Sequence, residues 1–438
     1  MNTPEAAFET LTPLTPLMDK CVHCGFCLST CPSYLLLGRE MDSPRGRIYL
    51  MKAGTEGRVG IGEAFVEHFD TCLGCMACET ACPSGVRYAP LIEETRAVVE
   101  HHHRRPLGER LFRQLLFLVL PFPARLRLLA WPMGLAHALR RRPRLLSWLP
   151  ATLRNLIELA PVAAPGTDAR EIPERTAAVG AARLRVGLLT GCVQRVFFSQ
   201  VNQATARVLS AEGCDVMAPG GQGCCGALAL HAGRDREARD FARDLIQAFD
   251  GLGLDSIVVS AAGCGSAMKG YGELLKDDPA WAGRASAFGA KVRDVTETLV
   301  ELGTARAPRH RLDLRIAYHD ACHLAHAQGV RREPRQLLEA IPGVTVTPLG
   351  ESEICCGSAG IFNLVQPEMA AELGRRKVER IADATPDLVV TSNPGCIVQI
   401  GAHARAAGHA FPVLHIIEVI DRSIRGTSLT NTNLKSEI

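Results

Sequence analysis

The 438-residue sequence has few aromatic side chains, almost no net charge and no long apolar run. Aromatic residues make up 5% of the chain, and 49 basic side chains nearly balance 46 acidic ones. A hydrophobic fraction of 47% excludes a disordered or fibrous protein. The net charge of +3 gives no sign of a nucleic-acid partner. The apolar run at residues 115–124 is well short of the roughly 18 residues that span a bilayer, so we expect no transmembrane helix.

The amino end also lacks the pattern of a secretory signal, because no apolar segment precedes Lys20, the first basic side chain. Cysteine, in contrast, is abundant, with 17 residues, an odd number. A disulfide framework is therefore disfavoured. We expect a cytoplasmic protein in which clustered thiolates bind metal.

The cysteines divide the chain into stretches, and its length predicts about three domains of roughly 150 residues. Residues 1–100 hold eight cysteines and two Cys-Pro steps and predict a metal-organised domain with little strand. Residues 101–183 hold no cysteine and predict a basic helical connector. Residues 184–310 and 311–425 predict two repeats, and residues 426–438 form a polar tail.

The two repeats are visible as three matching anchors. Residues 185–192 match 315–322, residues 224–226 match 355–357, and residues 255–264 match 387–396. Each matching segment contains a cysteine or ends at one. The distance in sequence between the two copies is nearly constant, at 130, 131 and 132 residues. The pattern predicts two copies of an α/β unit with buried parallel strands, helices such as residues 235–249, and cysteines at the strand ends, where ligands bind. The expected fold is an α+β and α/β multidomain chain, with a helical two-cluster ferredoxin-like domain before a duplicated α/β Cys-Cys-Gly domain.

The strongest motif is C-x2-C-x2-C-x3-C-P, which occurs twice, first from residue 21 and again from residue 72. Three cysteines on a tight turn can reach one cubane cluster, whereas the fourth points to a different cluster. The spacing predicts two [4Fe-4S] clusters, one held by Cys21, Cys24, Cys27 and Cys82, the other by Cys72, Cys75, Cys78 and Cys31. Zinc is disfavoured, because its closed tetrahedral sulfur sites use paired C-x2-C spacings. Eight ligands within 62 residues predict a domain that has little apolar core and folds only with its clusters.

Residues 21–52, which include Ser-Pro-Arg-Gly-Arg at 43–47, resemble the iron-sulfur subunit of bacterial glycolate oxidase, as do the second cysteine run and both Cys-Cys-Gly repeats. The resemblance extends to about residue 425. It implies that partner subunits carry flavin and oxidise glycolate to glyoxylate, while this chain holds no flavin, is not itself catalytic and passes electrons towards the quinone pool. The iron-sulfur subunit of a lactate or glycerol-3-phosphate dehydrogenase is the nearest alternative, because the substrate binds on another polypeptide.

The Cys-Cys-Gly repeats predict further metal ligands. Adjacent cysteines require a turn, which a following glycine permits through positive φ. In the wider family, exemplified by heterodisulfide reductase subunits, the repeat ends in C-x-x-C and binds an unusual cluster, but here Ala261 and Asn393 replace the first cysteine of that pair. The remaining thiols are Cys192, Cys224, Cys225 and Cys264, and then Cys322, Cys355, Cys356 and Cys396. Four thiols suffice for a cluster or another metal in at least one repeat; the alternative is buried free thiols, as expected for Cys214.

Polar residues around Cys322 are less informative. His319, Asp320, His323 and His326 surround it. Because the first repeat has aliphatic residues or threonine there, we expect polar packing rather than ligation. Residues 221–226 fit G-x-G-x-x-G in form only, since helical sequence follows and candidate ligand cysteines fill the variable positions.

The connector is unusually basic: residues 104–154 contain eleven arginines, one acid and two of the three tryptophans, Trp131 and Trp148. This composition fits a solvated connector and, equally, an interfacial segment on anionic lipid or an acidic partner. We expect peripheral contact with the inner face of the membrane. A heterodisulfide-reductase-like thiol enzyme is disfavoured by the missing cysteines. A redox sensor is disfavoured by the lack of an output module.

Overall fold

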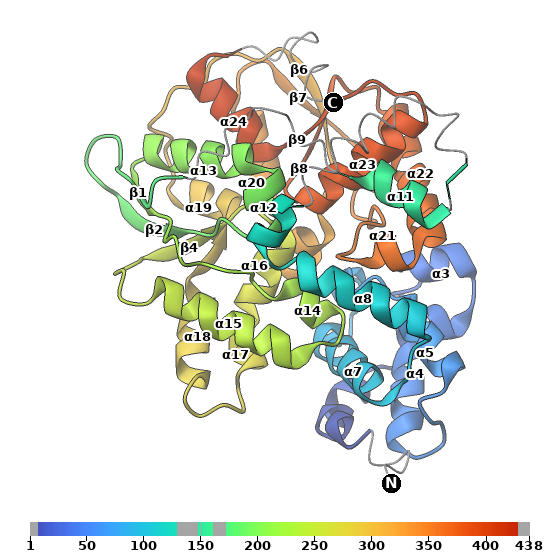
Figure 1. Ribbon diagram of the computed structural model, residues 1–438. Helices are drawn as coiled ribbons and strands as arrows, with labels where there is room; N and C mark the ends of the chain where they lie inside the picture. The colour runs from blue at the N-terminus through green and yellow to red at the C-terminus, as the bar shows by residue number, and fades with distance from the viewer. Residues whose placement is uncertain (1–7, 129–147, 150, 161–171, 428–438) are drawn as a thin grey trace.

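The computed structural model describes residues 8–128, 148–149, 151–160 and 172–427, and Figure 1 shows three parts that pack together. The amino-terminal part, drawn in blue, is helical, and its described residues up to 128 contain no strand. Its elements are η1 (Glu9–Leu14), α2 (Thr15–Met18), α3 (Pro32–Leu37), η2 (Glu40–Asp42), α4 (Pro44–Thr55), α5 (Glu63–Asp70), α6 (Ala77–Thr80) and α7 (Tyr88–His102). Helix and loop thus alternate around the two cysteine motifs.

Local sequence explains where α4 begins. Ser43 is its N-cap and accepts a hydrogen bond from the Gly46 amide at 3.0 Å, and Pro44 occupies the first turn. A side chain at Gly46 would come within 2.0 Å of the Glu40 carbonyl oxygen. Glycine is therefore required where α4 crosses η2.

An apolar core lies beneath the amino-terminal helices. Met51, Phe69, Leu91 and Ile92 are completely buried, and Phe65 stacks beside Phe69 with ring centroids 4.5 Å apart. The expectation that this domain has little core of its own is wrong. Helix α5, between the two cysteine motifs, and helix α7, after them, supply apolar residues to this core. The prediction was based on the number of ligands and left these two segments out.

The connector contributes α8 (Leu107–Val119) and α11 (Ala151–Leu159), which are drawn in cyan and green-cyan in Figure 1. Leu116 and Phe117 of α8 are buried against the two repeats, whereas the opposite side of α8 exposes a row of leucines. Trp131 and the arginines at 140–144 lie outside the described residues. Among the residues that the structure describes, every helix is too short or too polar to cross a membrane.

The first repeat forms a five-stranded sheet in the order β1-β3-β2-β4-β5. Its strands are β1 (Arg175–Thr176), β2 (Leu184–Leu188), β3 (Cys214–Met217), β4 (Ser256–Val259) and β5 (Val292–Asp294). Only β1 runs antiparallel to its neighbour, and the other pairs are parallel. Val186 and Val258 are completely buried, as expected for a parallel sheet covered on both faces.

The second repeat forms a four-stranded parallel sheet in the order β7-β6-β8-β9. Its strands are β6 (Leu314–Tyr318), β7 (Val344–Thr347), β8 (Leu388–Thr391) and β9 (Val413–His415). Strand register is also repeated: Val186 lies opposite Val216 and Ser256, and Ile316 lies opposite Val346 and Leu388. The predicted duplication and the fold class are confirmed.

Helices cover both sheets. Those of the first repeat are α12 (Val193–Phe197), α13 (Ser199–Ala211), α14 (Ala227–His231), α15 (Asp235–Phe249), α16 (Ala262–Lys269), α17 (Tyr271–Leu274), α18 (Ala282–Lys291) and α19 (Val295–Glu301). Those of the second are η3 (His323–Ala327), α20 (Glu333–Glu339), α21 (Phe362–Val365), α22 (Pro367–Asp383), α23 (Pro394–Ala406) and α24 (Ile416–Arg425). Helices α13 and α24 lie side by side in Figure 1, and a single apolar core joins the two sheets beneath them.

Candidate metal centres

The first motif begins on an irregular loop before α3. Gly25 adopts φ +88°, and a side chain there would come within 2.9 Å of the Arg45 guanidinium. That guanidinium donates to the carbonyl oxygen of His23 at 2.8 Å, so α4 holds the loop in place. Burial, together with the charges of Cys31 and Cys21, raises the pKa of the Cys27 thiol to about 11. A metal ion bound in place of the thiol proton would offset the unfavourable ionisation of this thiol.

The second motif is more deeply enclosed. Cys72 and Cys75 are buried, and the Gly74 amide donates to Cys72 Sγ at 3.4 Å. Arg96 on α7 donates to the carbonyl oxygen of Cys72. Met76, with φ +60°, turns the chain into α6, which carries Cys78. The three thiols therefore come from one tight turn, as the spacing predicts.

Cys31, the last cysteine of the first motif, lies near thiols of both motifs. Burial raises the pKa of Cys75 and of Cys78, and the charge of Cys31 raises both further. Cys31 ends the first motif immediately before α3, and its thiol is buried. Cys82 accepts a hydrogen bond from the Val86 amide at 3.4 Å. Sulfur-only donors in two neighbouring groups fit two iron-sulfur clusters, and the crossed assignment of Cys31 and Cys82 stays a prediction.

Arg47 is a buried cation beside the second motif. Its side chain is 1% exposed and donates to the carbonyl oxygen of His68 at 2.5 Å and to the Ser33 and Thr71 hydroxyls at 3.0 Å. The carboxylate of Asp42 lies 3.8 Å away. Sequence reasoning quoted Arg47 within the Ser-Pro-Arg-Gly-Arg segment but gave it no role.

The positive charges of Arg47 and Arg96 oppose the effect of burial on Cys72. Burial alone would raise the pKa of this thiol, but the two guanidinium groups hold it below its usual value. Cys72 is therefore prepared to be a thiolate, the form that binds metal. Arg96 belongs to α7, so it reaches Cys72 only in the folded chain.

The four thiols of the first repeat meet at the carboxyl edge of its sheet. Cys192 follows β2, Cys224 and Cys225 follow β3, and Cys264 lies on α16 after β4. The Sγ atoms of Cys192 and Cys224 are 3.5 Å apart, and Cys264 is close enough to influence the titration of Cys225. Gly226 adopts φ +77°, so the predicted turn after the cysteine pair is confirmed.

The second repeat gathers its thiols in the same way. The Sγ atoms of Cys322 and Cys355 are 3.9 Å apart, and Cys356 and Cys396 complete the group. Gly357 adopts φ +91°, and a side chain there would come within 2.7 Å of the Ala370 carbonyl oxygen. Cys214, in contrast, is completely buried in the apolar core and packs as predicted.

His319 lies beside two thiols of the second repeat. Its side chain is completely buried and neither ring nitrogen has a partner by hydrogen-bond geometry, but the imidazole is close enough to add to the lowering of the pKa of Cys356 by Cys355 and Cys396. A ring nitrogen and the Sγ atoms of Cys356 and Cys396 all lie within 4.8 Å of one another, the spacing of a metal site. Polar packing of this residue stays a prediction, and the geometry adds metal binding as an alternative to it. The mismatch with Leu189 in the first repeat was the sequence signal that could have identified it.

The three other polar residues near Cys322 do pack as predicted. Asp320 forms an ion pair with Arg335 at 2.7 Å, and His326 lies 2.9 Å from the Thr80 hydroxyl. His323 Nε2 lies 2.9 Å from the carbonyl oxygen of Gly74 and hydrogen-bonds to it. Two of these side chains therefore tie the second repeat to the second ferredoxin-type motif.

The second motif and the second repeat share an apolar contact. Leu73 and Cys75 pack in one buried cluster with Cys355 and Phe362, and Cys322 lies against it. Cys322 is also close enough to raise the pKa of Cys75. The thiols of the second motif therefore adjoin those of the second repeat.

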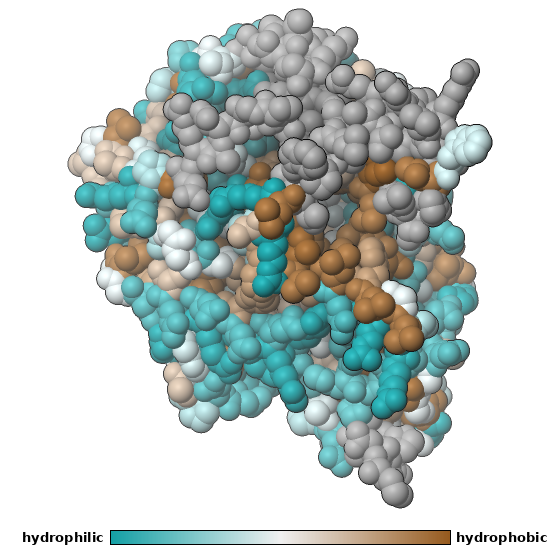
Figure 2. All heavy atoms as spheres, in the orientation of Figure 1, coloured by the Kyte–Doolittle hydropathy of each residue, from teal (hydrophilic) through white to brown (hydrophobic). Residues whose placement is uncertain are grey.

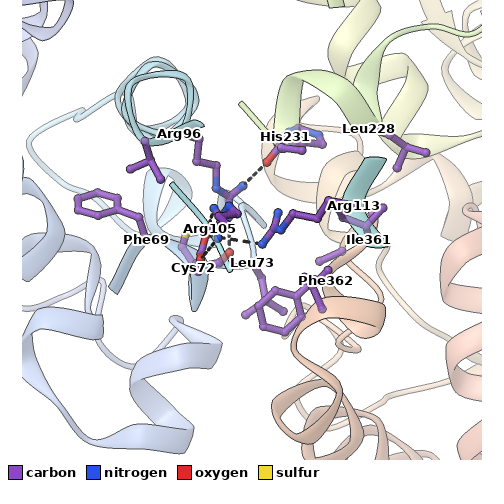
Figure 3. A pocket seen from close by; sticks show the side chains of 16 residues that line it. Phe69, Cys72, Leu73, Arg96, Arg105, Arg113, Leu228, His231, Ile361 and Phe362 are labelled. Atoms are coloured by element: carbon purple, nitrogen blue, oxygen red, sulfur yellow. Dashed lines mark hydrogen bonds and ion pairs between the residues drawn. The ribbon is translucent and has the colours of Figure 1, made fainter. Parts of the chain in front are cut away.

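A small cavity of about 50 Å³ lies where the amino-terminal part meets both repeats (Figure 3). Arg96 spans it and donates to the carbonyl oxygen of His231 at 2.9 Å. Arg105 is paired with Asp70 at 2.7 Å. Arg113, which points into the same space, is paired with Glu109 at 2.8 Å. Arg105 and Arg113 are thus paired with carboxylates and Arg96 is bonded to backbone carbonyls, so the cavity is a structural junction.

Two families match separate parts of the chain. A family described as a 4Fe-4S dicluster domain matches residues 17–86. A family described as a cysteine-rich domain matches residues 186–269 and again 316–401. The crystal structure of a hypothetical protein from Helicobacter pylori matches 96% of this chain and 76% of its own, with a TM-score of 0.51 and 8% identity, which concerns the fold alone.

Curated relatives match most of the chain. The probable glycolate oxidase iron-sulfur subunit of Bacillus subtilis is 37% identical over 87% of both chains. The glycolate oxidase iron-sulfur subunit of Escherichia coli is 36% identical over 93% of this chain and 94% of its own. Lactate utilization protein A of Exiguobacterium is 30% identical over 55% of this chain and 98% of its own.

Proposed function

This chain belongs to the family of glycolate oxidase iron-sulfur subunits, and from that premise we propose that it is the electron-carrying subunit of a glycolate dehydrogenase. In this proposal, flavin-containing partner subunits oxidise glycolate to glyoxylate, and this chain is not itself catalytic. The observation that carries the proposal is the contact of the second cysteine motif with the thiols of the second repeat.

The reaction balances across several subunits. Oxidation of glycolate to glyoxylate releases two electrons and two protons, and a quinone accepts the same number. Iron-sulfur clusters, when bound, supply one-electron chemistry between such two-electron partners. The chain's own residues hold the thiols, bury them and set the charge around them, as Arg47 and Arg96 do at Cys72.

The two repeats have different places in this proposal. Cys322 and Cys355 of the second repeat adjoin Cys75, and the hydrogen bond from His323 to Gly74 fixes their separation. The first repeat meets the amino-terminal part through α14 and α7, where Arg96 bonds to the His231 carbonyl rather than to a thiol. We propose that the second repeat is the one that adjoins the cluster pair in the electron path.

The isolated chain is expected to bind no flavin and to oxidise neither glycolate nor lactate with an artificial dye. Purification with and without the flavoprotein partners, followed by flavin analysis and dye-linked assays, checks this. Glycolate turnover that appears only in the reconstituted complex supports the proposal. Turnover of lactate alone would assign a different hydroxy acid, and stoichiometric flavin on the isolated chain would refute the division of roles.

We also propose peripheral attachment to the cytoplasmic face of the membrane. Four leucines on one side of α8 are exposed, and Figure 2 shows them as a brown band beside charged residues. These residues are Leu107, Leu111, Leu115 and Leu118. The arginines at 140–144, which lie outside the described residues, would add attraction of about 1 kcal/mol each at an anionic surface.

The complex is expected to sediment with anionic vesicles at low salt and to be released at high salt, because the Debye length shortens. Replacing Leu111 and Leu115 by serine, or Arg140, Arg141, Arg142 and Arg144 by glutamine, should move the complex to the supernatant with its iron content unchanged. Loss of flavoprotein binding in these variants would instead identify the segment as a subunit interface. A complex that ignores vesicles at low salt would also contradict the proposal.

A further inference from the structure

The surroundings of the two thiol groups differ although the folds around them repeat. Gly226 faces Ala238 of α15, and Gly357 faces Ala370 of α22, so these helices occupy equivalent places at an offset of 132 residues. On this alignment Lys377 takes the place of Leu245. His319 takes the place of Leu189 at the strand offset of 130.

The first repeat surrounds its thiols with apolar side chains. Leu189 and Leu245 are buried in one apolar cluster with Cys225 and Ala261. Such an environment favours neutral thiols over thiolates.

The second repeat places polar and charged groups at the same positions. Lys377 is 2% exposed, and it donates to the carbonyl oxygens of Glu351 and Ser352. Asn393, which replaces Ala261, donates to Cys396 Sγ at 3.6 Å. The thiols of the second repeat therefore lie among groups that can donate hydrogen bonds, as Asn393 does to Cys396, where the first repeat has apolar side chains.

His319 is the polar side chain of this group that has no partner by hydrogen-bond geometry. Its main-chain amide donates to Val390 at 2.9 Å, which fixes the residue at the end of β6, yet both ring nitrogens remain unsatisfied in the core. Burying a polar group in this way costs about 1–3 kcal/mol. Leu189 shows that the fold needs no imidazole at this position. A ligand that uses the nitrogen accounts for a histidine here.

We propose that His319 is a nitrogen ligand of a metal centre in the second repeat, beside the thiolates of Cys356 and Cys396, and that the first repeat has no equivalent ligand. The inference rests on the proposed metal binding by the second repeat. A mixed thiolate and imidazole donor set suits zinc or the iron of a cluster. On iron, a histidine ligand raises the reduction potential relative to an all-cysteine cluster.

The test uses the full chain in its complex, purified without oxygen, with isotope-labelled histidine. Iron and zinc analysis comes first, because two [4Fe-4S] clusters account for about eight iron atoms. Pulsed electron paramagnetic resonance then detects a histidine nitrogen coupled to additional iron, and X-ray absorption detects one bound to zinc. We expect metal beyond the two clusters and one histidine nitrogen ligand in the unmodified protein.

Two matched variants locate the nitrogen. His319→Gln should remove its signal, whereas His403→Gln, which changes a partly buried histidine of the same repeat, should retain it. His319→Leu copies the first repeat and guards against a folding defect of the glutamine variant. A third centre without a nitrogen ligand, or a signal that survives in His319→Leu, would overturn this inference alone. Metal content fully explained by the two clusters would overturn both the inference and the proposed binding by the second repeat.

Discussion

Replacing Cys82 by serine is expected to abolish the cluster of Cys21, Cys24 and Cys27 and to spare the cluster of the second motif. The reason is geometric. Three cysteines on one turn reach one cubane, and the helical turn before the fourth directs it to the other cluster. Cys31 lies near thiols of both motifs, because its charge raises the pKa of Cys27 as well as those of Cys75 and Cys78, so its position permits crossed ligation.

Cys31→Ser is the reciprocal variant and should damage the cluster of Cys72, Cys75 and Cys78. Iron analysis should show a loss of about half the cluster iron in each variant. Electron paramagnetic resonance of the reduced proteins should show that the two variants retain different clusters. If each variant loses the cluster of its own motif, ligation is not crossed.

Arg47→Gln is expected to lower the folding free energy by about 1.5–3 kcal/mol, the range for hydrogen bonds that involve a charged group. Asp42 keeps its ion pair with Arg39 at 2.6 Å, but the Ser33 and Thr71 hydroxyls and the His68 carbonyl lose a charged donor. The change should also lower the reduction potential of the second-motif cluster, because a nearby cation stabilises the more negative reduced state. Denaturant unfolding of the holoprotein and a redox titration measure the two effects.

Arg47→Lys separates charge from geometry. Lysine keeps the positive charge but cannot reproduce the fork of donors, so the potential should stay near that of the unmodified protein while stability falls. Arg58→Gln, on an exposed surface pair with Glu56, should cost no more than about 1 kcal/mol. An unchanged potential in Arg47→Gln would show that its charge does not act on the cluster.

Much of the carboxy-terminal fold could be predicted because both of its copies carry the same local signals. Short apolar runs followed by a cysteine marked β2, β4, β6 and β8, and the predicted helix at residues 235–249 has the same bounds as α15. Glycine after each cysteine pair correctly indicated positive φ.

The rest depends on contacts between distant segments. Arg96 reaches Cys72 only because α7 packs beside the second motif, and His323 meets Gly74 across 249 positions of sequence. The core of the amino-terminal part was missed because α7 extends it beyond the cysteine motifs. His319 was discounted because the first repeat lacks it, although that difference is what distinguishes the second repeat.

In the proposed complex, electrons from the hydroxy acid enter this chain from a partner flavoprotein. Rapid mixing of the oxidised, oxygen-free complex with limiting glycolate tests it directly, with the visible absorbance of the iron-sulfur clusters as the signal. The account predicts bleaching of the clusters within a single turnover, by two electrons per glycolate, and no bleaching when the flavoprotein is omitted. Glyoxylate formation with clusters that stay oxidised throughout that turnover, or bleaching of the isolated chain by glycolate, would contradict it.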